Sequence, residues 1–354
     1  MHFVMIGVSH KIAPLEVREK FFLRPIEREL LLSQFKNETG IVEAFILSTC
    51  NRTEIYAHLL EDAPMPLIQS LFKIKNLVYS QNLAKYLYVK KNRDAVRHLF
   101  SVSTGLDSLI VGEKQILGQV KTATELARKD GMLGKQFNIL TNLAIRLGKK
   151  ARTETQIDAG GSSISWAAMK MAENLLGQLK DKSVLIIGAG KMGKLAANHF
   201  QQKGIGQIYV INRSQEKAED LAKQYGGVAV GFWQVKDVLA QADVCICSAN
   251  CAHYIIEKDL VEQVMRTRQG RKLLFIDISI PRNIHPSVAA AKNVCLLTID
   301  DLDKVLEENL SRRRQAIQEV EMIIAKKMDE FYEKLAKRKT SEDFNLCEVV
   351  QREQ

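Results

Sequence analysis

The chain has 354 residues, of which 46% are hydrophobic and 26% are charged. This composition is typical of globular proteins and argues against disorder, and the length indicates two or three domains. No run approaches eighteen consecutive apolar residues, so we expect no membrane-spanning helix. The formal net charge is +10, and such a basic surface permits a nucleic-acid partner without requiring one.

Positive charge is concentrated ahead of residue 300, because residues 300–354 hold 14 acidic and 11 basic side chains. A dense basic stretch lies within residues 121–154, where three acidic residues also occur. On a helix face such a stretch can hold phosphates, although a solvated face is the more ordinary explanation. Its basic members are Lys121, Arg128, Lys129, Lys135, Arg146, Lys149, Lys150 and Arg152.

The six cysteines are few and irregularly spaced for a chain of this length. That usage suits a reducing compartment and does not suit a disulfide scaffold. The first residues also lack the basic segment and the small-residue cleavage site of a secretory signal peptide. We therefore expect a cytoplasmic protein.

Residues 2–7, 43–49 and 54–59 are short apolar or alternating segments, which predict strands. Residues 50–52 then form a tight connection between two strands, an exposed and rigidly anchored position for a reactive side chain. From residue 94 to residue 177 apolar residues recur at helical spacing, which predicts several helices. The Gly-Gly-Ser-Ser cluster at 160–163 predicts a linker and a domain boundary.

A series of short, continuous apolar runs follows, separated by helical or loop segments. This pattern is typical of a parallel sheet buried on both faces, and so of a doubly wound α/β domain. The runs are residues 184–187, 207–211, 228–230, 244–247, 273–278 and 294–297.

The segment from about residue 301 to residue 337 predicts one long helix, because it is charged, periodic and free of Gly and Pro. About 37 residues at a rise of ~1.5 Å give a rod near 55 Å long, more than one small domain can cover. We therefore expect a homodimer in which two copies of this helix pair through an apolar stripe. The stripe consists of Val305, Ile317, Val320, Ile324, Phe331 and Leu335.

A glycine fingerprint follows the predicted strand at 184–187 and opens a helix, which is the context that a dinucleotide-binding turn requires. Gly188 permits the tight turn, Gly190 lets the backbone approach a pyrophosphate, and Gly193 lets helix and strand pack closely. The helix N-terminus supplies free N–H groups for the phosphates. The candidate cofactor-binding residues of this turn are Gly188, Ala189, Gly190, Lys191, Met192 and Gly193.

The residues after the second strand of this unit select between the two nicotinamide cofactors. A domain specific for NAD places Asp or Glu there, to accept a hydrogen bond from the ribose 2′-OH. This chain has Asn212, Arg213 and Ser214 instead. An arginine with two small polar neighbours favours a 2′-phosphate, so we expect NADPH.

Cys50 is the best candidate for a nucleophile, because the sequence Ser-Thr-Cys-Asn-Arg at 48–52 surrounds it with polar groups and one cation. A nearby guanidinium stabilises a thiolate, and the thiolate is the reactive form. A cysteine nucleophile combined with a nicotinamide predicts that an acyl group is reduced through a thioester.

Two other groups are explained more simply as structural. Cys245, Cys247, Cys251 and His253 invite a zinc interpretation, but their spacing matches no compact zinc motif and the first two lie on a predicted buried strand, so we expect no metal. His98 lies at helical spacing beside Leu99 and Phe100, where bare sequence favours a core histidine.

Taken together, the motifs resemble the glutamyl-tRNA reductase family. The similar segments run in collinear order through about residue 330. They are GVSHKIAPLEVRE at 7–19, ILSTCNRTEIY at 46–56, AVRHLFSVSTGLDSLIVGEKQILGQVK at 95–121, GAGKMG at 188–193, NRS at 212–214, FIDISIPRNI at 275–284 and IDDL at 299–302.

The resemblance implies an α/β protein with three parts. These are an N-terminal α+β catalytic domain (1–158), a central Rossmann-type NADP-binding domain (159–300) and a long C-terminal helix with a shortened dimerisation region (301–354). The implied reaction converts glutamyl-tRNA(Glu) and NADPH to glutamate-1-semialdehyde, the first step of tetrapyrrole synthesis. Glutamate-1-semialdehyde aminomutase is a possible partner, and heme feedback stays open.

The resemblance also assigns roles to individual residues. Cys50 is the nucleophile, and His98 matches a histidine that the family places near the reacting carbon, as a general acid or base or as an orienting group. Pairing of Glu113 with the substrate ammonium and of Arg52 with its carboxylate is our own inference. The substrate-binding set is Thr49, Asn51, Arg52, Ser108, Glu113, Lys114, Gln115 and Gln119.

Three features depart from the family pattern. The chain ends at Gln354, where the family usually continues into a helical dimerisation domain. Asn250 and Cys251 stand where a small Thr-Gly-like pair is usual near the cofactor, and Trp166 stands at a position that is usually small. These departures predict altered nicotinamide positioning and altered packing beside the hinge.

Two alternatives remain. An NADP-dependent oxidoreductase of the shikimate dehydrogenase type would share the fingerprint and the Asn-Arg-Ser turn, but it does not need the Cys50 loop. A non-catalytic paralogue that binds tRNA or heme would have no need for the nucleophile.

Overall fold

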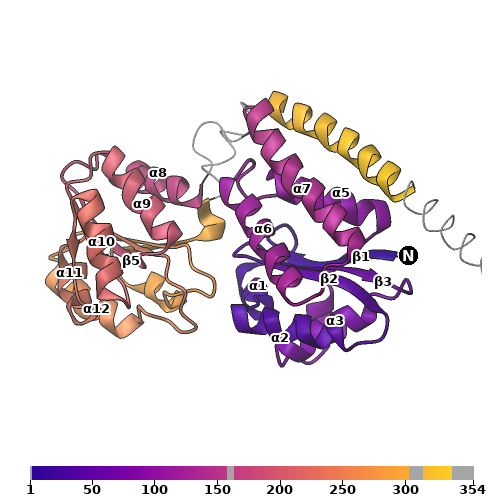
Figure 1. Cartoon of the computed structure of the whole chain (residues 1–354). Helices are drawn as coiled ribbons and strands as arrows, with labels where there is room; N and C mark the ends of the chain where they lie inside the picture. The colour runs from indigo at the N-terminus through magenta and orange to yellow at the C-terminus, as the bar shows by residue number, and fades with distance from the viewer. Residues whose placement is uncertain (1, 158–162, 303–313, 337–354) are drawn as a thin grey trace, which may run out of the picture. The chain divides into compact units, whose positions relative to one another are not determined.

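The computed structural model describes residues 2–157, 163–302 and 314–336 (Figure 1). Residues 2–157 and 314–336 form one compact unit, and residues 163–302 form a second. The expected boundary near 158–162 lies outside the described residues, so it stays a prediction. None of the described helices is long and apolar enough to cross a membrane.

The first unit is built on an antiparallel sheet with the strand order β2-β3-β1-β4. All three strands that the sequence predicted here are present, while β4 and the helices of residues 15–84 were not anticipated. In chain order the elements are β1 (His2–Ser9), α1 (Leu15–Phe21), α2 (Pro25–Lys36), β2 (Ile41–Ser48), β3 (Arg52–Leu59), α3 (Met65–Ile74), α4 (Gln81–Ala84), β4 (Tyr88–Lys91), α5 (Asn92–Thr104), α6 (Lys114–Lys129) and α7 (Lys135–Glu154).

Helices cover both faces of this sheet, with α1, α2 and α3 below it and α5 and α7 above it in Figure 1. Every residue of β3 is buried as a result. Because successive side chains of a strand point to opposite faces, Arg52, Glu54 and Tyr56 share one face and Thr53 and Ile55 share the other. The first of these faces meets α5, which brings polar groups into the interior.

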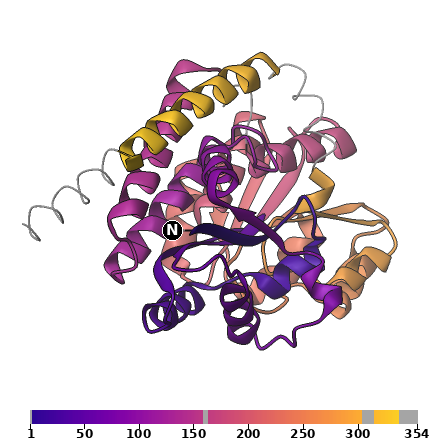
Figure 2. The same cartoon turned by 90° about the vertical axis from the view of Figure 1, so that its right-hand side faces the viewer.

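The C-terminal helix, described over residues 314–336, packs against the same unit. Its apolar stripe is buried there, since Val320 and Phe331 have no exposed surface and Ile324 has 1%. The ring of Phe331 lies 5.9 Å from the ring of Phe3 on β1. Figure 2 shows this helix along the outside of the unit.

The homodimer was predicted because the chain's own domains were expected to leave the apolar stripe uncovered, and this reason is wrong for residues 314–336. The expected stripe is not left open to a second copy, because the sheet and helices of its own chain cover it. Val305, the first residue of that stripe, lies outside the described residues. On the outward side Met322 is the one large apolar side chain of residues 314–336 that is well exposed, at 66%, so the described helix offers no second apolar face.

The second unit confirms the doubly wound α/β fold. Its sheet is parallel, with the strand order β10-β9-β8-β5-β6-β7, which is the strand order of dinucleotide-binding domains. The elements are α8 (Ile164–Leu176), β5 (Ser183–Ile187), α9 (Lys191–Gln202), β6 (Gln207–Ile211), α10 (Gln215–Tyr225), β7 (Val228–Ala229), η1 (Phe232–Gln234), α11 (Val235–Gln241), β8 (Val244–Cys247), α12 (Lys258–Thr267), β9 (Leu273–Asp277), η2 (Pro286–Ala290), β10 (Val294–Thr298) and η3 (Ile299–Leu302).

Candidate active site and nucleotide site

The connection between β2 and β3 holds Cys50 in a fixed turn. The backbone N of Thr49 donates to the carbonyl of Arg52 at 2.8 Å, and the Thr49 hydroxyl accepts from the backbone N of Asn51 at 3.2 Å. From α1, Nη1 of Arg18 donates to the Cys50 carbonyl and to Oδ1 of Asn51, each at 3.2 Å. The tight connection is confirmed, but the expected exposure is wrong: Thr49, Asn51 and Arg52 are buried and Cys50 is half-buried.

Beside this turn lies a buried cluster of charged groups. Nη1 of Arg52 donates to Oε1 of Glu54 and to Oδ2 of Asp107, both at 2.8 Å. Nη2 of Arg52 donates to the Asp107 carbonyl, and Lys11 forms an ion pair with the Asp107 carboxylate. Arg52 is 2% exposed, and carboxylates of its own chain already bind its guanidinium.

Glu54 is the centre of this cluster and has no exposed surface. Besides Arg52, three side chains bond to its carboxylate. The hydroxyl of Tyr56 donates to Oε2 at 2.7 Å, the hydroxyl of Tyr88 donates to Oε1 at 2.6 Å, and Nε2 of His98 lies 2.8 Å from Oε1. A buried carboxylate is stable only with such a complete set of partners.

His98 therefore does more than fill a helix face. His98 lies on α5, is 9% exposed, and faces Glu54 on the sheet. The centres of the Tyr56 and Tyr88 rings lie 6.5 Å and 5.7 Å from the centre of the His98 ring. The bond through Nε2 fixes the orientation of the imidazole and leaves Nδ1 as the other ring nitrogen that can exchange a proton.

Charge pairing outweighs burial at both carboxylates of the cluster. Burial alone would raise the pKa of Glu54, but Arg52 and then His98 lower it, so that the pKa is held far below its usual range. Burial also acts to raise the pKa of Asp107, and the charge of Arg52 and the bond from Lys11 lower it overall. Both groups are thus anionic at neutral pH.

Arg52 acts on the Cys50 thiol in the expected direction, because its charge lowers the thiol pKa, but larger effects outweigh it. Burial raises the pKa of the Cys50 thiol to about 12, and the negative charge of Glu113 raises it further, against the smaller opposing effects of Arg18 and Arg52. Sequence could not reveal this, because burial of the turn depends on the helices that cover it. In this structure the resting form of Cys50 is the neutral thiol.

A thiol with this pKa should show a distinctive pH profile of alkylation. Since only the thiolate reacts, we expect the rate of Cys50 modification by iodoacetamide to rise about tenfold per pH unit through pH 9, where a free cysteine levels off near its pKa of about 8.5. The Cys50 peptide is followed by mass spectrometry. Glu113→Gln should move the profile to lower pH, and a plateau near pH 7 in the unmodified sequence would contradict the prediction.

The residues expected to bind substrate gather around the start of α6. Ser108, Glu113 and Gln115 are buried, at 7%, 6% and 7% exposure, and the hydroxyl of Ser108 has no hydrogen-bond partner among the described residues. Gln119 lies one turn beyond Gln115 and is half-buried. The negative charge of Glu113 raises the pKa of the Cys50 thiol, so the two groups interact electrostatically.

Lys114 differs from these residues, since it is exposed at the first position of α6. The backbone carbonyl of Glu113 is held by Nη2 of Arg152 on α7 at 3.1 Å. The start of α6 is therefore anchored by the neighbouring helix.

Several members of the site were missed from the sequence: Arg18, Glu54, Tyr88, Asp107 and His10. Alternation along residues 52–56 could have placed Glu54 beside Arg52, because both belong to one face of a strand. His10 lies against the turn, with its backbone N bonded to the Asn51 carbonyl at 2.9 Å. Burial, and then the charge of Arg52, lower the pKa of His10 to about 4, so its imidazole is neutral near the thiol.

The glycine turn in the second unit fits a dinucleotide. Gly188 has a φ of +108°, which side chains rarely adopt. A Cβ on Gly193 would collide with the carbonyl oxygen of Gly188, whereas the space above Gly190 is open. Gly190 is the N-cap of α9, so the N-terminus of this helix, which attracts anions, lies beside the open space.

The residues after β6 lie directly beside the turn. Oδ1 of Asn212 accepts from the backbone N of Ala189 at 3.2 Å, and the Ser214 hydroxyl caps α10 by accepting from the backbone N of Lys217. Arg213 between them is exposed. The predicted fingerprint and the predicted Asn-Arg-Ser turn thus meet at one edge of the sheet.

A neighbouring loop is ordered by a carboxylate that the sequence analysis did not single out. Asp277 ends β9, is 1% exposed, and accepts from the backbone N of Ser279, Asn283 and Ile284 at 3.0, 2.7 and 2.8 Å. Burial raises the pKa of Asp277 to about 6 despite these donors. Its place at the carboxyl end of β9 puts this loop at the same edge as the fingerprint.

Two of the three departures from the family pattern fall in the same unit, while the end of the chain lies outside the described residues. Cys251 follows β8, and its Sγ lies 3.4 Å from Nε2 of His253. The backbone carbonyl of Cys251 accepts a hydrogen bond from Nδ2 of Asn283 at 3.4 Å. Cys245 and Cys247 are fully buried on β8, as expected of a core strand. Trp166 is half-buried on α8, where its backbone N bonds to the N-cap Ser163.

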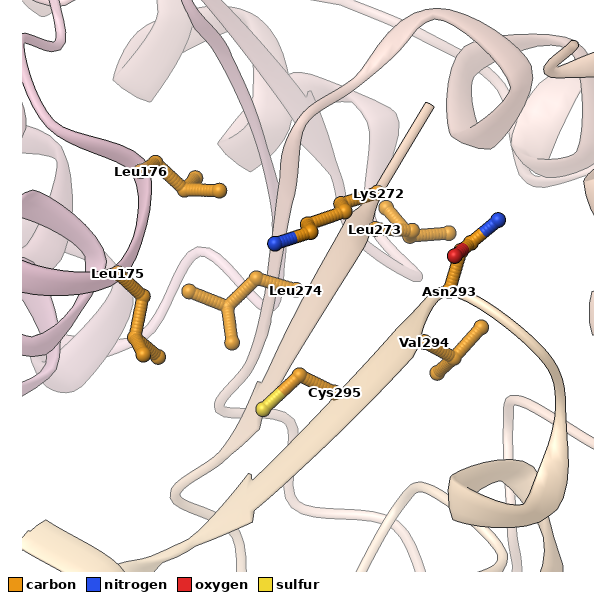
Figure 3. A pocket seen from close by; sticks show the side chains of 8 residues that line it. All are labelled: Leu175, Leu176, Lys272, Leu273, Leu274, Asn293, Val294 and Cys295. Carbon is orange, nitrogen blue, oxygen red and sulfur yellow. The ribbon is translucent and has the colours of Figure 1, made fainter. Parts of the chain in front are cut away.

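A cavity of about 190 Å³ lies at the opposite edge of the sheet (Figure 3). It is bounded by the amino ends of β9 and β10 and by the end of α8, and its walls include Leu175, Leu274 and Cys295. Ligand pockets usually exceed about 300 Å³, and nucleotides bind at the carboxyl ends of such strands. This cavity is therefore separate from the nucleotide site.

Comparison with known proteins gives a consistent result for both units. Residues 6–155 match the family model for the N-terminal domain of glutamyl-tRNA(Glu) reductase, and residues 170–305 match the model for shikimate/quinate 5-dehydrogenase. The chain is 39% identical over 337 residues to glutamyl-tRNA reductase of Bacillus pumilus, covering 94% of this chain and 73% of the relative. For glutamyl-tRNA reductase of Heliobacterium mobile the identity is 40%, with 94% and 75% covered.

A solved structure agrees with these matches. Glutamyl-tRNA reductase from Methanopyrus kandleri is similar with a TM-score of 0.52 and 38% identity, over 95% of this chain and 81% of that one.

Proposed function

Because the chain belongs to the glutamyl-tRNA reductase family, we propose that it reduces glutamyl-tRNA to glutamate-1-semialdehyde with NADPH, the first step of tetrapyrrole synthesis. One observation carries the proposal. Cys50 sits in a fixed turn beside a buried Arg52, Glu54 and His98 cluster, in a chain that also holds a dinucleotide-binding sheet. A thiol and a hydride donor together suit reduction of an activated acyl group.

The first step is acyl transfer to Cys50. The sulfur attacks the carbonyl carbon of the glutamyl ester, the bond to the ribose oxygen of the tRNA breaks, and the thiol proton goes to that oxygen. His98 is the proposed proton carrier, because Glu54 holds its ring in one orientation. The product is a thioester on Cys50 and free tRNA.

Substrate binding also changes the state of the thiol in this proposal. Glu113 raises the pKa of Cys50, and an α-ammonium paired with Glu113 would offset its negative charge. The bound substrate therefore favours the thiolate that attacks it. Arg52 would hold the turn through Glu54 and Asp107, and any substrate carboxylate that it binds must share it with these two.

A bound pyridine nucleotide would supply the hydride that reduces the Cys50 thioester to the aldehyde, with the Cys50 thiolate as the leaving group. The open space over Gly190 and the N-terminus of α9 would take the pyrophosphate. The family uses a pyridine nucleotide, and we assign it as NADPH because exposed Arg213 follows β6 where an acidic residue would select NAD.

Arg213→Ala tests this cofactor assignment. We expect the Kd for NADPH to rise about 10- to 100-fold, because a hydrogen bond to a charged group is typically worth ~1.5–3 kcal/mol. The Kd for NADH should change little, since it lacks the 2′-phosphate. Both values are measured by titration calorimetry, with Lys217→Ala on exposed α10 as the matched control. Equal losses for the two cofactors would mean that Arg213 does not bind the 2′-phosphate.

The tRNA would meet the basic stretch on α6 and α7. Lys121, Arg128, Lys135, Arg146 and Lys149 are all exposed there, which suits contact with phosphates. The homodimer and the aminomutase partner stay predictions of the resemblance, as does a cytoplasmic location.

A single-turnover assay tests the function directly. Purified protein, glutamyl-tRNA(Glu) and NADPH should release semialdehyde and free tRNA in equal amounts. Shikimate with NADP serves as the competing substrate, because residues 170–305 also match the shikimate dehydrogenase model. Oxidation of shikimate without semialdehyde formation would favour that alternative, and tRNA binding with no turnover would favour the non-catalytic one.

A further inference from the structure

The end of β7 carries an aromatic surface that no step above uses. Trp233 is 83% exposed and its neighbour Phe232 is 45% exposed, both on η1 directly after β7. A single exposed apolar side chain needs no explanation. The position of Trp233 does need an explanation, because η1 lies beside the turn at residues 212–214 that is predicted to bind the 2′-phosphate.

A chain of contacts links Trp233 to the glycine fingerprint. The backbone N of Val230 donates to the carbonyl of Val210 at 2.9 Å, which continues the parallel register of β6 and β7 and brings Gly231 level with Asn212. Asn212 is bonded to Ala189 of the fingerprint at 3.2 Å. The Trp233 ring covers Gly231 so closely that a Cβ at this position would collide with it.

Adenosine is the part of the dinucleotide that belongs here. The first half of a doubly wound sheet, here β5 to β7, binds the adenosine, while the pyrophosphate lies at the N-terminus of the first helix. From the open space at Gly190 the molecule must therefore pass Asn212 toward the ends of β6 and β7. An exposed indole there offers a flat face to a purine, with exposed Arg213 nearby for the 2′-phosphate.

We propose that Trp233 is the stacking platform for the adenine ring of the nucleotide, and that Gly231 makes room for its indole. This inference rests on the proposed use of NADPH. It assigns affinity to a ring contact that is separate from the charge contact of Arg213. Stacking does not distinguish NADPH from NADH, so Trp233 contributes equally to both, and Arg213 alone discriminates between them.

Adenosine 2′,5′-bisphosphate tests the proposal without turnover, because it carries the adenine and the 2′-phosphate but no nicotinamide. The chain has two tryptophans, so Trp166→Phe leaves Trp233 as the fluorophore and Trp233→Phe leaves Trp166. We expect the ligand to quench the fluorescence of the wild-type protein and of Trp166→Phe, and to leave that of Trp233→Phe unchanged.

Calorimetry gives the matching affinities. Loss of one base-aromatic stack should raise the Kd of Trp233→Ala for adenosine 2′,5′-bisphosphate, NADPH and NADH by about 5- to 100-fold, while Trp233→Phe should stay within a few-fold. Unchanged affinities in Trp233→Ala would overturn the inference and leave the cofactor proposal standing. A change of sedimentation in that variant with unchanged affinity would overturn it in favour of a protein contact. A wild-type protein that binds none of the three ligands would overturn the cofactor proposal itself.

Discussion

Cys50→Ser should abolish reduction of glutamyl-tRNA and leave the Kd for NADPH unchanged. The thiol is the proposed acyl acceptor, and a serine hydroxyl is a far weaker nucleophile in the same turn. Removal of a catalytic nucleophile typically costs on the order of 10⁴- to 10⁶-fold in kcat. Single-turnover formation of semialdehyde measures the effect.

The matched control is Cys295→Ser. Cys295 is an exposed cysteine on β10, in the other unit, so its replacement should preserve activity. Appreciable aldehyde formation by the Cys50 variant would eliminate the thioester route. Loss of activity in both variants would instead point to general sensitivity of the protein to cysteine replacement.

Glu54→Gln should cause the largest loss of stability. It removes the negative charge opposite buried Arg52 and leaves the hydroxyls of Tyr56 and Tyr88 and the ring of His98 competing for one neutral oxygen and one amide. Breaking a buried ion pair on one side typically costs ~3–5 kcal/mol. The free energy of unfolding, from urea denaturation, measures it.

An exposed carboxylate provides the comparison. Glu125 on α6 pairs with Lys121 at 3.7 Å, with both side chains more than half exposed, so Glu125→Gln should change stability by less than about 0.5 kcal/mol. A similar small change in Glu54→Gln would show that the buried cluster does not depend on its central charge.

The same variant should alter the acid dependence of stability. The pKa of Glu54 is lowered on folding, against the effect of burial, by Arg52 and His98. A group with a depressed folded pKa contributes stability above its unfolded pKa of about 4.3, and this contribution is lost as the pH falls further. We therefore expect the unfolding free energy of Glu54→Gln to fall less steeply below about pH 4.3 than that of the wild-type protein.

Periodicity was enough to predict the second unit, because each buried parallel strand is a continuous apolar run that needs no knowledge of its neighbours. The turn at Cys50 could also be predicted, since it lies between two local patterns. The convergence of Tyr88 and His98 on Glu54, and of Asp107 on Arg52, could not, because these segments meet β3 only after folding. Alternation along a strand can predict that a polar side chain faces the interior, but it does not predict which side chain it will contact there.

The C-terminal stripe illustrates the same limit. Its period correctly indicated a helix with one buried face, and residues 314–336 confirm it. Length and hydrophobicity did not identify the covering surface, which is the sheet and helices of the first unit. Likewise the sign of the Cys50 pKa shift depends on how closely α1 and the turn pack, and composition carries no such information.

The pairing of Phe3 with Phe331 has a consequence for synthesis on the ribosome. The first strand leaves the exit tunnel early, but the helix that covers it follows only after the whole nucleotide-binding unit. At about 5–20 residues per second this interval lasts roughly 15–65 s. During that time α5 and α7 can already cover part of the sheet, but the apolar surface that the last helix buries, beside Phe3, has no cover from that helix, so we expect chaperones to shield it until the last helix arrives.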